Sequence, residues 1–77
     1  MTPSARQWLV EFAERLGIDA PSDTECEEIL ALAGIAAHSS ERTAAPVACW
    51  LAARAGLSVA DALDVANSLV APDSNDA

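Results

Sequence analysis

Apolar residues recur every three or four positions through most of this chain, which is the spacing of amphipathic α-helices. The first such segment follows Thr2-Pro3 and ends at Gly17, a residue that tolerates the left-handed backbone common at helix ends. On its polar side, Glu11 and Arg15 stand four residues apart, which favours an ion pair. We expect Ile18 to fold back over the core. The apolar positions share one face: Ala5, Trp8, Leu9, Phe12, Ala13 and Leu16.

A second helical segment begins after the turn at 19–21, where Ser22 and Glu25 have the spacing of a capping box. Acidic residues fill its first turns, where the helix dipole favours negative charge. Gly34 costs about 1 kcal/mol relative to Ala inside a helix, and we interpret it as the site of a close helix crossing. Because the connecting turn is short, we expect the first two helices to be antiparallel neighbours. The apolar face consists of Cys26, Ile29, Leu30, Leu32, Ala33, Ala36 and Ala37.

Two shorter helices follow, the first starting near Ala45-Pro46 and terminated by Gly56. One stripe of this helix carries Val47, Trp50, Leu51 and Arg54. Ser58 and Asp61 then form an acidic version of the capping box. The last apolar face consists of Val59, Ala62, Leu63, Ala66, Leu69 and Val70.

The pattern as a whole predicts an all-α fold, a compact and mainly antiparallel bundle of four short helices. We expect one helical domain over residues 1–71 and a disordered tail over 72–77. With 77 residues the chain is near the lower limit for an unaided core, and we expect both Trp8 and Trp50 to pack inside it. The alternative for these two side chains is an anchor at a protein interface. The expected helices are Ser4–Leu16, Asp23–Ser40, Pro46–Ala55 and Val59–Val70.

Charge and composition narrow the function classes. The net charge is −8, with twelve acidic residues, four Arg and no Lys, which argues against binding nucleic acid or an anionic membrane surface. The acidity serves solubility or matches a basic partner. No apolar run approaches the ~20 residues of a membrane span and no signal-peptide layout is present, so we expect a cytoplasmic protein. Cys26 and Cys49 lack metal-ligand spacing, and we expect free thiols and no metal.

The connection from His38 to Pro46 is the best candidate for a site. It holds the only histidine, and if the helix continues, Glu41 and Arg42 follow His38 at three- and four-residue spacing. A carboxylate beside the imidazole would fix its tautomer, whereas the plainer interpretation is a surface ion pair at a helix end. Because the segment lacks a nucleophile–base pair, a second histidine and a metal-ligand set, we expect no enzyme activity, no catalytic residue and no cofactor.

The order Ala37-His38-x-x-Glu41-Arg42-x-x-Ala45-Pro46, preceded by Trp8-Leu9, resembles a family of small bacterial helical domains of unknown function. Members of that family stand alone or are fused to molybdenum cofactor guanylyltransferase-like proteins. Val47-Ala-Cys49-Trp50-Leu51 departs from the family pattern, since Cys49 occupies a polar position. The resemblance implies an all-helical fold and an association with molybdenum cofactor handling, and it implies no catalytic residue.

Three functional hypotheses follow. The first is a non-enzymatic accessory or protein-interaction module that presents His38, Glu41, Arg42 and Pro46 to a protein partner, such as a molybdenum cofactor enzyme or maturation factor. The second is a small-molecule domain, in which Arg42 pairs with an anionic or nucleotide-like ligand and His38 completes the pocket. The third is a purely structural junction, in which Arg42 caps helix carbonyls and Glu41 holds Arg42. A homodimer is compatible with all three, because small domains often gain core by association.

Overall fold

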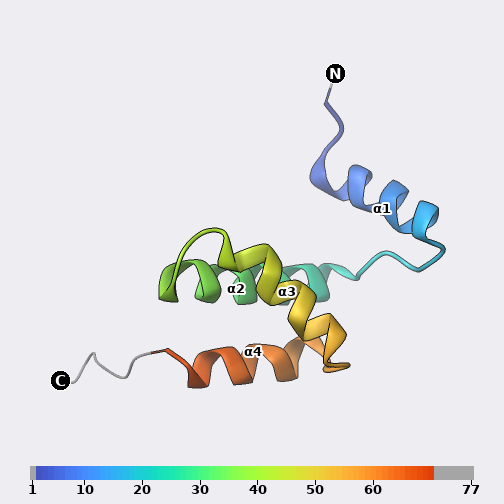
Figure 1. Ribbon diagram of the computed structural model, residues 1–77. Helices are drawn as coiled ribbons and strands as arrows, with labels where there is room; N and C mark the ends of the chain where they lie inside the picture. Colours follow the sequence, from blue (N-terminus) through green and yellow to red (C-terminus); the bar gives the residue numbers. More distant parts are fainter. Residues whose placement is uncertain (1, 71–77) are drawn as a thin grey trace.

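The computed structural model describes residues 2–70 and contains four α-helices within that range, with no strand (Figure 1). The predicted fold class, an all-α bundle of four short helices, is confirmed. The predicted tail at 72–77 lies outside the described residues. The helices are α1 (Ala5–Leu16), α2 (Asp23–Ser39), α3 (Ala44–Arg54) and α4 (Val59–Ser68).

Local capping explains where the helices begin and end. The predicted capping box of α2 is present: the Glu25 N–H donates to Ser22 Oγ at 3.1 Å, and the Ser22 N–H donates to Glu25 Oε1 at 2.9 Å. At α4 only the Ser58 half of the predicted box is present, with the Asp61 N–H donating at 3.1 Å. α1 has a full box that was not predicted, formed by Ser4 and Gln7.

Helix α2 is the centre of a three-helix unit, since it packs against both α3 and α4. The chain runs along α2, returns along α3 and reverses again along α4, so that α3 is antiparallel to its two neighbours (Figure 1). Leu32 of α2 and Ala62 of α4 are the buried residues of this unit. A core this small leaves many larger apolar side chains on the surface.

The face of α3 that packs inward differs from the predicted one. The expected stripe of Val47, Trp50 and Leu51 is exposed, and the half-buried residues of α3 are small: Ala44, Ala45, Ala48, Cys49 and Ala52. The Cys49 thiol points at the Ile29 carbonyl of α2, with sulfur and oxygen 4.0 Å apart. Small side chains let the axes of α2 and α3 approach closely, so the prediction from the larger residues was wrong.

Helix α1 lies apart from the three-helix unit and packs against none of its helices (Figure 1). The expectation that the first two helices are antiparallel neighbours is therefore wrong. Ile18, expected over the core, is exposed. α1 extends one end of the molecule, whose dimensions are 46 × 30 × 20 Å.

The two tryptophans were expected in the core, and both are exposed, Trp8 by 52% and Trp50 by 57%. Each contacts a side chain four residues further along its own helix. The rings of Trp8 and Phe12 have centroids 5.0 Å apart, and the Arg54 guanidinium lies 5.2 Å above the Trp50 ring. Intrahelical contacts of this kind leave the outer faces of both rings accessible to solvent.

Two further expectations concern Gly34 and the cysteines. A Cβ at Gly34 would meet no atom within 4 Å, so no helix crosses there closely and that interpretation was wrong. Cys26 and Cys49 are both free, as predicted. Within the described part of the chain, no helix combines the length and apolar character needed to cross a membrane.

Candidate functional site

The structure distributes the predicted site over the end of α2, the following turn and the start of α3. His38 is exposed in the last turn of α2, which ends at Ser39, and Ser40 leaves the helix with φ −141° and ψ −105°. Glu41 and Arg42 therefore do not follow His38 on a continuous helix. Pro46 is the third residue of α3 and is exposed, in a first turn where its missing N–H costs no hydrogen bond.

The polar contacts of this junction are local. Glu41 accepts hydrogen bonds from the Thr43 hydroxyl at 3.4 Å and, through its carbonyl, from the Ala44 N–H at 2.9 Å. The Arg42 carbonyl accepts from the Ala45 N–H at 3.1 Å. Among residues 2–70, the side chains of His38 and Arg42 form neither a hydrogen bond nor an ion pair with another side chain or the backbone.

A hollow of about 610 Å³ lies beside His38, between the end of α2 and the segment after α4. Its other lining residues include Ile35, Leu69 and Val70, whereas Glu41, Arg42 and Pro46 do not line it. The four predicted residues are thus near one another in sequence without surrounding one cavity.

A different surface stands out in three dimensions. Helix α1 presents four large apolar side chains on one face, and all four are exposed although no other helix packs on them. Clusters of exposed apolar residues of this kind mark interaction sites more often than isolated ones do. We call this surface the α1 face, and it consists of Trp8, Leu9, Phe12 and Leu16.

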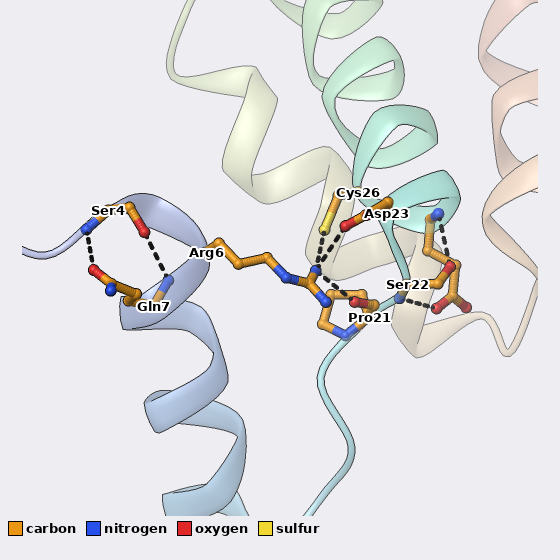
Figure 2. Close-up of polar contacts among 8 residues, drawn as sticks. Ser4, Arg6, Gln7, Pro21, Ser22, Asp23 and Cys26 are labelled. Carbon is orange, nitrogen blue, oxygen red and sulfur yellow. Dashed lines mark hydrogen bonds and ion pairs between the residues drawn. The ribbon is translucent and has the colours of Figure 1, made fainter.

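Arg6 is the link between α1 and the rest of the molecule (Figure 2). Its Nη1 donates to the Pro21 carbonyl at 3.1 Å, lies 3.2 Å from Asp23 Oδ1 and is 4.0 Å from Cys26 Sγ. These contacts span fifteen to twenty residues, so helical spacing in the sequence gave no signal for them. Arg6 thereby holds the start of α1 near the first turn of α2.

Arg6 also stands at the edge of a hollow between α1 and α2. This hollow has a volume of about 350 Å³ and is lined mainly by apolar side chains, including Leu9, Ile29 and Leu30. A volume of this order can accept one large side chain. The gap exists because α1 is tethered through its arginine and does not pack on α2 through its apolar face.

A second apolar depression lies on the three-helix unit, where α3 and α4 diverge. It has a volume of about 290 Å³. Its large lining residues are exposed in the isolated chain, and smaller ones, mostly alanines, form the floor. We call it the α3/α4 groove, and its large exposed residues are Leu51, Leu57, Val65 and Leu69.

The large exposed side chains of both surfaces are apolar. Within residues 2–70, no cluster of three or more His, Cys, Asp or Glu side chains is placed to hold a metal ion. Negative charge is concentrated between the α1–α2 loop and the first turns of α2, in Asp19, Asp23, Glu25, Glu27 and Glu28. The geometry is suited to binding an apolar surface of a macromolecule.

Comparison with models of known protein families gave a match over nearly the whole chain. The model of a family described as a domain of unknown function, DUF6457, matches residues 2–76. No curated protein and no solved structure was found to match the chain.

Proposed function

The chain belongs to the DUF6457 family, a domain of unknown function, and we propose that it is a non-enzymatic protein-interaction module that docks through the α1 face. The observation that carries the proposal is the exposure of Trp8 and Phe12 on a helix that no other helix covers. Tryptophan and phenylalanine are enriched at the centres of protein interfaces. We expect the partner to be a cytoplasmic protein.

Helix stability supports the same proposal. An isolated helix of about 12 residues is marginal in water, even with favourable residues. α1 has 12 residues, and its ties to the three-helix unit are the polar contacts of Arg6. A surface that covers the α1 face would supply the apolar packing that the rest of this chain does not provide.

Affinity capture from native lysate tests the proposal, with the wild type compared with Trp8→Asp and Val47→Asp. Val47 is a matched control because it is as exposed as Trp8 and lines none of the hollows described above. We expect a partner that Trp8→Asp loses and Val47→Asp keeps, and that binds again when purified. Retention of every partner by Trp8→Asp would refute docking through the α1 face.

The predicted junction is a second surface for the same module. His38 and Arg42 are exposed and their side chains are available for a partner with complementary charge. Arg42→Ala belongs in the same capture experiment, and unchanged partners would remove the junction from the interface. The family resemblance suggests proteins of molybdenum cofactor maturation as the first purified candidates.

A small-molecule site is the alternative, and the hollow beside His38 is the observation that favours it. A thermal-shift screen with nucleotides and pterin-like ligands tests this alternative directly. A saturable shift that His38→Ala abolishes would support it, whereas a flat screen would contradict it. Arg42→Ala shows whether the guanidinium takes part.

A further inference from the structure

We infer that the partner that covers the α1 face is a second copy of this chain, with α1 of each copy bound in the α3/α4 groove of the other. This inference rests on the proposed role of the α1 face in docking. The same molecule carries both an uncovered amphipathic helix and an unfilled apolar groove. The two surfaces are complementary in shape, because the α1 face projects large apolar side chains and the α3/α4 groove is a depression lined by apolar side chains. When two copies exchange α1 in this way, the two resulting interfaces are related by one two-fold axis, and the assembly is a closed dimer.

The dimensions of the two surfaces agree. At about 1.5 Å per residue, the 12 residues of α1 extend over about 18 Å. The 11 residues of α3 and 10 residues of α4 extend over about 15 to 17 Å by the same measure. A groove bounded by these two helices is therefore about as long as the helix proposed to occupy it.

Both surfaces expose large apolar side chains. Trp8 and Phe12 of the α1 face are 52% and 47% exposed, and Leu51 and Val65 of the α3/α4 groove are 56% and 54% exposed. Mutual covering of these two surfaces removes apolar area of both from water, which favours association.

The charge distribution permits self-association despite the net charge of −8. Helix α1 is neutral, because Arg6 and Arg15 balance Glu11 and Glu14. The groove helices together carry one arginine, Arg54, and two aspartates. The acidic cluster between residues 19 and 28 lies outside both surfaces, in the α1–α2 loop and the first turns of α2. Two copies therefore meet through surfaces of low net charge.

Sedimentation velocity over a wide concentration range tests the inference on the full chain. We expect a reversible monomer–dimer equilibrium and a melting temperature that rises with concentration. Trp8→Asp, on the α1 face, and Val65→Asp, in the groove, should each raise the dimer Kd by about tenfold or more, as expected when an interface anchor is lost. Val47→Asp is the matched control, because Val47 and Val65 are 55% and 54% exposed, and its Kd should remain unchanged.

Mixing the two variants tests the exchange itself. A dimer of one Trp8→Asp chain and one Val65→Asp chain retains one intact interface. In this interface, the wild-type α1 of the Val65→Asp chain binds in the wild-type groove of the Trp8→Asp chain. We expect the equimolar mixture to dimerise more strongly than either variant alone. Failure of the mixture to recover dimer would overturn the exchange in favour of another contact, such as α1 against α1. Circular dichroism of each variant establishes that the helices have formed.

The outcomes separate this inference from the proposed function. A chain that is monomeric at all concentrations but loses a captured partner on Trp8→Asp overturns the dimer and leaves the interaction module intact. A monomer whose Trp8 fluorescence, measured in a Trp50→Phe background, resists quenching by acrylamide overturns both, because α1 then closes on its own chain. A dimer sensitive to Trp8→Asp and Val65→Asp supports the inference.

Discussion

Arg6 decides where α1 lies, although its contacts contribute little to stability. The guanidinium and its carboxylate partner Asp23 have side chains 53% and 88% exposed, and exposed pairs of this kind contribute about 0–1 kcal/mol. Their effect is positional, since the same nitrogen also donates to the Pro21 carbonyl. Among the described residues, Arg6 thus supplies the polar contacts between α1 and the start of α2.

We expect Arg6→Ala to free α1 while changing the free energy of unfolding by less than about 1 kcal/mol. The measurement is the fluorescence anisotropy of Trp8 in a Trp50→Phe background, at a dilution where the chain is monomeric, and it should fall. Arg15→Ala is the control, because Arg15 pairs with Glu11 on the same helix, at 3.5 Å, and does not link α1 to α2. Equal anisotropy in all three proteins would show that Arg6 does not hold α1.

Gly34 offers a second test at single-residue scale. Because a Cβ there would meet open space, Gly34→Ala should stabilise α2 by about 1 kcal/mol through the higher helix propensity of alanine. Thermal unfolding followed by circular dichroism measures this. Gly56→Ala provides the contrast, since Gly56 has φ +77°, a conformation that costs an alanine roughly 1 kcal/mol or more. A lower melting temperature for Gly34→Ala would mean that another surface packs on Gly34.

At the scale of elements, α1 and α2 both begin with a serine capping box, but they differ in how much of the fold packs on them. Ser22 caps α2, which packs against α3 and α4, whereas Ser4 caps α1, which packs against neither. Ser22→Ala should therefore destabilise the three-helix unit by about 1 kcal/mol, the usual contribution of an N-cap. Ser4→Ala should reduce helical content in the dilute chain without moving the main unfolding transition.

Urea unfolding followed by circular dichroism distinguishes these two cap variants. If both shift the transition midpoint equally, α1 unfolds together with the rest of the protein. That result in the monomeric chain would contradict the separation of α1 from the three-helix unit. Ser58→Ala is a positive control, because Ser58 caps α4 within the three-helix unit.

At the scale of the molecule, the acidic charge is uneven, and we expect it to oppose folding between residues 19 and 28, where it is densest. Glu27 and Glu28 lie beyond the first turn of α2, so they add to the repulsion with little benefit from the helix N-terminus. Added salt shortens the screening length from about 30 Å at 0.01 M to about 8 Å at 0.15 M. We expect the melting temperature to rise with salt over this range.

A variant with Glu27→Gln and Glu28→Gln should have a higher melting temperature at low salt and a weaker dependence on salt. Glu14→Gln is the matched control, since Glu14 belongs to the neutral helix α1. Differential scanning calorimetry at three salt concentrations measures the melting temperature of each protein and its dependence on salt. A melting temperature independent of salt in the wild type would show that this acidic cluster is not destabilising.

The candidate site was only partly predictable from the sequence. The apolar positions of α1 were predicted to share a face, and they do, but Trp8 was expected inside the core. The junction around His38 and Arg42 drew attention through residue chemistry, yet its polar contacts are local and its residues do not surround one hollow. The Arg6 contacts join residues far apart in the chain, and no periodicity indicates such pairs.

The sequence by itself determined the helices, because helical spacing, serine caps and the terminal glycines act over a few residues. It also determined the acidic surface and the small volume available for a core. Only the tertiary structure decided which faces became interior. Alanines rather than Trp50 or Val47 bring α3 against α2, and among residues 2–70 α1 is joined to the unit by the polar contacts of Arg6, without helix packing. Burial depends on which helices approach one another, and contacts between residues distant in sequence determine which helices do so.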